Sequence, residues 1–361
     1  MKKSLLFFLF LTLISLPSIF WGQSSYQAAI EEAEVIFNEF AERNDIPGTA
    51  VAVSIDGEIV WSEGYGFADL EQNVKVYPQR TKFRVGSVSK PFTAAALARL
   101  YEAGLIDLDL PIQTYVPDFP KKKWPITLRQ LAGHTAGIRH YRGDEFLSSQ
   151  HYPTVEEGLT IFADDPLLFE PGTDYSYSSY GWNLVSAAIE GASGVSFLTF
   201  MQDSVFIPLE MYHTAADYTN RLVPRRSRFY VKGQNGQIIP APFVDNSYKW
   251  AGGGFLSTVE DMVRFGQAHL DGSAADEATI QEWIRPQKTT DGESTNYGIG
   301  WQSGVDDAGR AWFGHSGGSV GGITQLIVYP EQRIVVAMLT NLSPVDYDEA
   351  HQKIAQCFME K

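Results

Sequence analysis

Cysteine is almost absent from this chain, since Cys357 is the only one among 361 residues. A single cysteine cannot form an internal disulfide, so the fold has to be stabilised without such cross-links. The composition allows this, because 44% of the residues are hydrophobic and 13% are aromatic. A chain of this length can bury a large core, as one large domain or as two lobes.

A basic excess is missing as well. The formal net charge is −15 at pH 7, and the one run of lysines, Lys121–Lys123, is short and lies between prolines. Proteins that bind a phosphate backbone need a concentrated positive surface. We therefore expect no nucleic-acid partner.

The sequence also lacks a recognisable metal-binding pattern. His134, His140 and His151 are near one another along the chain, but their spacing fits no known set of ligands and no cysteine accompanies them. We interpret them as histidines of loops or of the packed interior. The sequence predicts neither a metal nor another cofactor.

Long apolar runs are confined to the N-terminus. Two lysines in residues 1–3 precede an apolar run from Leu5 to Leu16, and small or polar residues follow near Gly22. This pattern is typical of a secretory signal peptide, here residues 1–23. A retained N-terminal anchor is the alternative, although the run is short for a bilayer span. After cleavage we expect no membrane span, and a periplasmic or secreted protein.

The remaining residues, 24–361, have the pattern of an α/β (α+β) fold. Thr49–Ile55 and Glu58–Ser62 are β-rich and are joined by an Asp-Gly pair, which is a strong hairpin signal. Strand-like runs return at Thr324–Tyr329 and Arg333–Leu339. The sequence predicts an antiparallel sheet built from both chain ends and flanked by helices. We expect this sheet and its helices to form an α/β lobe of about 24–86 and 241–361, with an inserted helical lobe of about 87–240.

The segment Phe83–Lys90 contains the strongest candidate for a nucleophile. Strand-like residues break at Gly86, and a helix is expected to follow. Lys90 comes three positions after Ser87, so one helical turn brings its amine to the serine hydroxyl, which needs a base to react at neutral pH. The helix N-terminus also favours developing negative charge. The alternative is a solvent-facing lysine on a helix capped by Ser87 or Ser89.

A second polar segment, Pro171–Tyr180, is rich in serine and tyrosine and precedes a helix. A tyrosine hydroxyl beside a cationic lysine would lose its proton more readily than its usual pKa of about 10 suggests. The alternative is a helix-initiating turn whose tyrosines only pack.

The third segment, Phe313–Gly322, is rich in glycine and lies between strand-like runs. Glycine lets a backbone approach a ligand closely and present its N–H groups. A loose, bulged hairpin without a ligand is the alternative. Ser316 and Ser319 each fit a Gly-x-Ser-x-Gly pattern, but that elbow requires a helix after the serine, and Thr324–Tyr329 is strand-like.

Taken together, Gly86–Lys90, the turn at Tyr177 and His315–Gly317 resemble the three active-site motifs of the class C β-lactamase and penicillin-binding-protein-like serine hydrolases. The match covers nearly all of the chain after the signal peptide, because other stretches are similar too: Leu131–Ile138, Phe169–Thr173, Trp250–Ser257 and Tyr297–Trp301. Two stretches most resemble the mitochondrial serine β-lactamase-like branch of this superfamily: Gly137–Tyr141 and Asn246–Trp250.

The resemblance implies a β-lactamase/transpeptidase-like fold and an acyl-enzyme mechanism. It implies that Ser87 is the nucleophile, that Lys90 activates it, and that Tyr177 carries a proton to the leaving group. The backbone N–H groups of Ser87 and Gly318 would form the oxyanion hole.

The resemblance also implies that the substrate contacts Ser179, His315, Ser316 and Gly317. Ser179 replaces an asparagine of the class C pattern, and His315 replaces a lysine whose charge would face a substrate carboxylate. A histidine with a pKa near about 6.5 is mostly neutral at pH 7 and gains charge toward pH 6. We therefore expect weak or no β-lactamase activity, with anionic substrates favoured at lower pH.

Two hypotheses of different class follow. The first is an exported serine hydrolase that forms an acyl-serine on a small-molecule, ester, amide or peptide substrate. The second is a filament-forming or scaffolding interaction protein on the same fold, which the resemblance to the mitochondrial branch suggests. Both allow a homo-oligomer.

Overall fold

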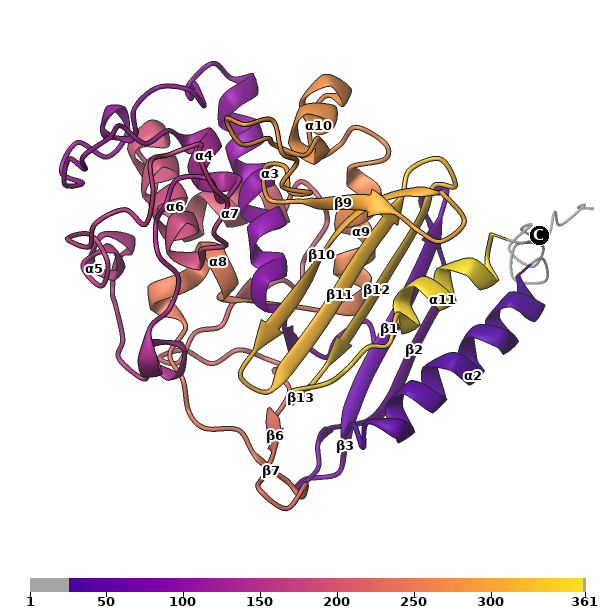
Figure 1. Ribbon diagram of the computed structural model, residues 1–361. Coiled ribbons are helices and arrows are strands. Elements are labelled where there is room, and N and C mark those ends of the chain that lie inside the picture. Colours follow the sequence, from indigo (N-terminus) through magenta and orange to yellow (C-terminus); the bar gives the residue numbers. More distant parts are fainter. Residues whose placement is uncertain (1–25, 360–361) are drawn as a thin grey trace, which may run out of the picture.

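The computed structural model describes residues 26–359, so the predicted signal peptide lies outside the described residues. Its centre is a seven-stranded antiparallel sheet with helices on both faces (Figure 1). In spatial order the strands are β3 (Val74–Lys75), β2 (Glu58–Asp69), β1 (Gly48–Ile55), β12 (Ile334–Thr340), β11 (Gly322–Tyr329), β10 (Ala311–Ser319) and β9 (Gln302–Val305).

The two chain ends meet in the middle of this sheet. β1 pairs with β12, with Val53 opposite Val336, and every residue of both strands is buried. Successive side chains point to opposite faces, so Val53 joins the core under the outer helices while Ala52 joins the core of the helical part. This arrangement confirms the predicted antiparallel sheet built from both chain ends.

Two terminal helices cover the outer face of the sheet. α2 (Gln27–Arg43) buries Phe37 and Phe40, and α11 (Ala350–Cys357) buries Ile354 beside them. The helices lie next to each other although they come from opposite ends of the chain (Figure 1). The apolar face of α2 therefore packs on the outer face of the sheet, as its amphipathic pattern predicts.

The helical part of the molecule covers the inner face. Its central element, α3 (Ser89–Glu102), is buried along most of its length, and α9 (Val259–Ala268) lies directly on β1 and β12. The surrounding helices are α4 (Leu128–Ala132), α5 (Val155–Leu159), α6 (Ser179–Ser193), α7 (Phe197–Met201), α8 (Trp250–Gly253) and α10 (Glu277–Ile284). The lobe boundaries near residues 87 and 240 remain a prediction.

Two small sheets join these layers. One has the order β4 (Phe83–Arg84), β8 (Phe255–Ser257) and β5 (Ala215–Ala216); the other has the order β13 (Leu342–Ser343), β6 (Tyr230–Lys232) and β7 (Ile238–Pro240). The first leads the chain from the sheet region into α3.

Within residues 26–359, no single helix has the length and apolarity to cross a membrane; one bent pair, α6 with the segment Phe197–Phe206, passes by length and composition only.

Candidate active site

Ser87 stands where β4 gives way to α3. The chain breaks at Gly86, whose φ is +51°, and Ser87 lies in the one-turn 3-10 helix Gly86–Val88. A Cβ on Gly86 would lie 2.6 Å from the carbonyl oxygen of Gly318, so both the backbone angle and the space require glycine there. This turn brings the start of α3 against β10, between the helical part and the sheet.

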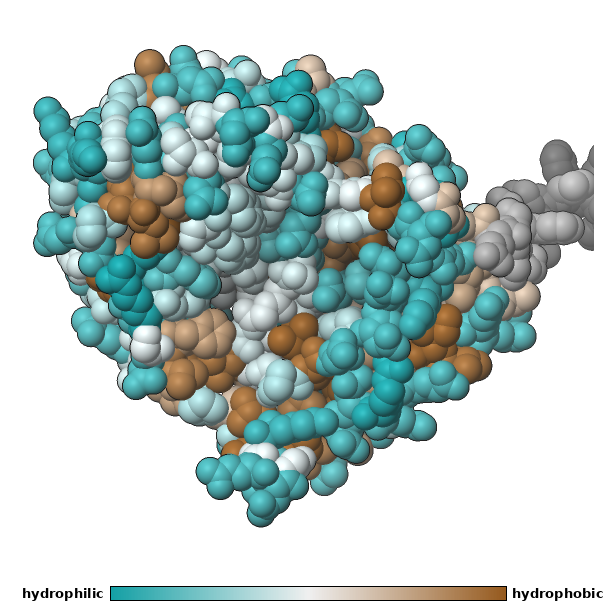
Figure 2. All heavy atoms as spheres, in the orientation of Figure 1, coloured by the Kyte–Doolittle hydropathy of each residue, from teal (hydrophilic) through white to brown (hydrophobic). Residues whose placement is uncertain are grey.

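Figure 2 shows that the face of the molecule turned to the viewer is hollowed between these two parts, with surface of near-neutral hydropathy in the hollow.

Lys90 is fully buried, which excludes the solvent-facing lysine of the alternative reading. Its Nζ lies 3.1 Å from Ser87 Oγ, 3.1 Å from Ser179 Oγ and 2.7 Å from the carbonyl oxygen of Gly252. Burial holds the pKa of this amine well below its usual value, and the nearby charge of Lys249 lowers it further. The site therefore favours a neutral amine in contact with the serine hydroxyl.

Tyr177 lies beside this pair, and its ring centroid is 4.7 Å from Lys90 Nζ. Burial raises the pKa of its hydroxyl far above the usual range. The expectation of a readily ionised tyrosine is therefore wrong, because desolvation outweighs any help from Lys90. Tyr177 is positioned as a protonated hydroxyl.

Two histidines hold the Tyr177 turn in place. The backbone N–H of Ser178 donates to His134 Nδ1 at 3.0 Å, and that of Ser179 donates to His140 Nδ1 at 3.2 Å. Burial is the main cause that lowers both pKa values, that of His140 to about 4. The sequence placed these residues among loop or packing histidines, whereas the structure gives them a specific role in positioning the turn.

His315 is buried beside the same turn, with 3% of its surface exposed. Its Nδ1 lies 2.6 Å from the carbonyl oxygen of Ser316, which can only accept, so Nδ1 carries the proton and Nε2 accepts from the Tyr297 hydroxyl at 2.8 Å. Burial lowers the pKa of His315 to about 3. The expected gain of charge near pH 6 is therefore wrong, because this ring stays neutral there.

The free edge of β10 faces the serine turn. β9 pairs with β10 only over Ala311–Gly314, so within residues 26–359 the rest of β10 has no strand on that side. Gly318 N lies 2.9 Å from the Cβ position of Gly86, and a Cβ on Gly317 would lie 3.2 Å from Ser87 N. The two backbone N–H groups predicted for an oxyanion hole thus come from adjoining segments.

The remaining sequence-based site residues divide in two. Ser179 belongs to the cluster through Lys90, whereas Ser316 is exposed on β10. β10 turns directly into β11 after Ser319, so neither glycine-flanked serine precedes a helix. The nucleophile-elbow reading is excluded.

Sequence reasoning assigned no role to several residues around this cluster: Tyr141, Lys249, Gly252 and Tyr297. They lie in stretches whose sequence resembles the serine hydrolase family, and this resemblance is the only feature of the sequence that could have indicated a role for them.

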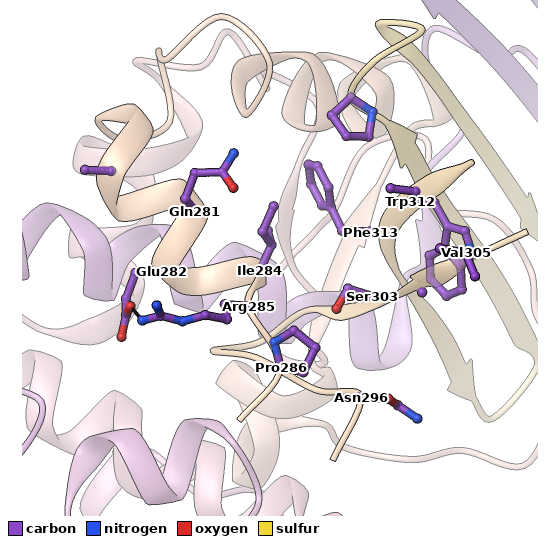
Figure 3. Close-up of a pocket in the computed structure, with 14 residues that line it drawn as sticks. Gln281, Glu282, Ile284, Arg285, Pro286, Asn296, Ser303, Val305, Trp312 and Phe313 are labelled. Carbon is purple, nitrogen blue, oxygen red and sulfur yellow. Dashed lines mark ion pairs between the residues drawn. The ribbon is translucent and has the colours of Figure 1, made fainter. Parts of the chain in front are cut away.

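A separate pocket of about 700 Å³ lies between α10, β9 and β10 (Figure 3). Ile284, Ser303 and Phe313 are among its lining residues, and no predicted site residue is. This pocket is distinct from the Ser87 cluster.

Replacing Gly317 with alanine should damage the site. The new Cβ would lie 2.0 Å from the carbonyl oxygen of Val85, forcing β10 away from the serine turn. We expect the rate of covalent labelling by a serine-reactive phosphonate to fall at least about tenfold, with a lower melting temperature. Gly253→Ala is the matched control, because its Cβ would meet Gly86 at an ordinary 3.8 Å. Equal labelling of both variants would contradict the close approach.

Three comparisons with known proteins agree on the kind of fold. A family model described as Beta-lactamase matches residues 34–356. The human mitochondrial serine beta-lactamase-like protein LACTB is 30% identical over 91% of this chain and 80% of its own.

Two solved structures are similar as well. The octameric penicillin-binding protein homologue from Pyrococcus abyssi has a TM-score of 0.80 at 25% identity, over 92% of this chain and 78% of that chain. The D-amino acid amidase from Ochrobactrum anthropi has a TM-score of 0.75 at 22% identity, over 92% and 98%. The β-lactamase/transpeptidase-like fold is thereby confirmed.

Proposed function

Because this chain belongs to the β-lactamase family of serine hydrolases, we propose that it cleaves an ester, amide or peptide through an acyl intermediate on Ser87. The observation that carries the proposal is the contact of Ser87 Oγ with the buried Lys90 amine at 3.1 Å. A neutral amine has two N–H donors and one lone pair. Gly252 O and Ser179 Oγ can accept the two N–H groups, which leaves the lone pair for the Ser87 hydroxyl.

In the first step Lys90 Nζ takes the proton from Ser87 as Oγ attacks the substrate carbonyl carbon. The carbonyl oxygen becomes an oxyanion, which accepts from the N–H groups of Ser87 and Gly318. Burial keeps Lys90 neutral before the attack and makes it a base at neutral pH.

Tyr177 completes the acylation step. Its hydroxyl is protonated and its ring lies beside Lys90, so it donates a proton to the departing oxygen or nitrogen and is reprotonated from Lys90. Water then attacks the acyl-serine by the reverse sequence, giving the acid and free Ser87.

The same proposal includes weak or no β-lactamase activity. A neutral His315 bonded to Tyr297 offers no fixed positive charge to a β-lactam carboxylate beside β10. An ion pair of that kind in a desolvated site is worth a few kcal/mol.

Export and self-association also belong to the proposal. The N-terminal sequence pattern supports a periplasmic or secreted location. The octameric homologue supports a homo-oligomer of this chain. Light scattering across a range of protein concentrations tests the latter, and monomers throughout would contradict it.

A fluorophosphonate probe tests the nucleophile. We expect one label per chain on Ser87 of the folded protein, and complete loss of the label in Ser87→Ala. Ser319→Ala should still be labelled, because Ser319 Oγ donates to Gly322 O within the turn after β10. A folded protein without Ser87-dependent labelling would overturn the proposed function.

A further inference from the structure

Lys249 is a second buried lysine beside the Ser87 cluster. Only 3% of its surface is exposed, and its ammonium has no hydrogen-bond acceptor among residues 26–359. Three aromatic rings surround it instead: Nζ lies 4.2 Å from the Phe146 ring centroid, 5.1 Å from that of Tyr248 and 5.3 Å from that of Tyr141. A buried cation is thus present without an anion bonded to it.

The acidic group whose charge acts on Lys249 already has other partners. Asp217 exerts a favourable charge effect on Lys249, but its Oδ2 accepts from Arg84 at 2.7 Å and from Asn246 at 2.9 Å. Its Oδ1 accepts from Arg226 at 3.1 Å. This carboxylate is therefore not available as a direct partner of the lysine.

Lys249 belongs to the wall of the Ser87 site. It immediately precedes α8, whose Gly252 carbonyl accepts from Lys90. A Cβ built on Gly253 would lie 3.8 Å from Lys249 Cδ and also 3.8 Å from the carbonyl carbon of Gly86, next to Ser87. Its charge also acts on Lys90 and on His140, both of which hydrogen-bond to Ser179 of the Tyr177 turn.

An unpaired buried ammonium destabilises a folded protein, and contacts with aromatic rings offset only part of that cost. Burial and the charge of Arg84 lower the pKa of Lys249 to about 7. Destabilised charged groups of this kind concentrate at functional sites, where a ligand supplies the missing partner.

We infer that Lys249 binds a carboxylate on the acyl part of the substrate, so that this hydrolase acts on acyl compounds that carry an acidic group. The inference rests on the proposed function. The acyl side is part of the inference: Lys249 contacts the rings of Tyr141 and Phe146, whereas Tyr177, which would serve the leaving group, contacts Lys90.

A matched pair of p-nitrophenyl esters tests this. The pentanoate is neutral, and the glutarate half-ester has the same chain length with a terminal carboxylate. We expect Lys249→Met to lower kcat/KM for the half-ester by about 10- to 100-fold more than kcat/KM for the pentanoate, mainly through KM, because any effect of Lys249 on Lys90 is common to both esters. Lys232→Met is the control, because Lys232 pairs with Asp45 after α2, and it should leave both rates unchanged.

The melting temperature gives a second readout. Lys249→Met should keep it or raise it by roughly 1–3 °C, since the variant removes an unpaired buried charge. Equal losses of kcat/KM on both esters would mean that Lys249 acts only through Lys90. A lower melting temperature with no change in ester preference would mean that Lys249 only stabilises the fold. Either result would overturn the inference. Ser87 labelling would persist in that case and leave the proposed function standing. Absent labelling and hydrolysis in the unmodified protein would overturn both.

Discussion

Lys90→Met is expected to lower kcat/KM for a neutral ester at least about 1,000-fold, and Ser87→Ala by a similar factor. The double variant should lose little more than either single variant, because the two groups act in the same proton transfer. Methionine keeps most of the volume of Lys90 and removes only the amine that contacts Ser87 Oγ at 3.1 Å. Steady-state hydrolysis of p-nitrophenyl pentanoate measures all three losses.

Lys122→Met is the matched control for this cycle. Lys122 Nζ donates to the backbone carbonyls of Ala163 and Asp165, so its loss also removes contacts of an ammonium with main-chain oxygens. Activity should stay within about twofold of the unmodified protein. Losses that add up in the Ser87–Lys90 double variant would show that Lys90 only supports the fold.

The sequence predicted the parts of this site that lie within short segments. Ser87 and Lys90 are one helical turn apart, so local geometry alone brings them together once α3 forms. The sheet was predictable as well, because the β-rich hydrophobic runs of both chain ends need a shared core.

The sequence did not predict the groups that meet only through tertiary packing. His134 and His140 precede the Tyr177 turn by some forty positions, yet their ring nitrogens accept from its backbone. Nothing in their spacing indicates that contact. Likewise, the sequence indicated no role for Lys249 beyond its place in Asn246–Trp250, a stretch that resembles the family.

Burial explains the two predictions of charge that were wrong. For Tyr177 and His315, the sequence shows neighbouring residue types but not the depth of the site. Burial is the largest cause of both pKa shifts, and it favours the neutral form of each group. In the folded protein Tyr177 and His315 are therefore both neutral, and they lie near the neutral amine of Lys90.

The same burial predicts a steep loss of stability in mild acid. His269 and His315 are both buried, and burial lowers their pKa values to about 4 and about 3. In the unfolded chain each binds a proton below a pKa of about 6.5. Between these values the unfolded state binds more protons than the folded state, so stability falls as the pH falls.

From pH 7 to pH 4.5 these two histidines together should lower the free energy of unfolding by about 5 kcal/mol. Urea unfolding at half-unit pH steps measures the slope, and His269→Leu should reduce it by about 1.4 kcal/mol per pH unit below pH 6. His213→Leu is the control, because His213 is exposed to solvent in the folded protein. A slope that His269→Leu leaves unchanged would mean that this ring is protonated in the folded state, and the expected acid sensitivity would be wrong. The slope therefore tests, by a stability measurement alone, the desolvation that lowers the pKa values of these buried histidines.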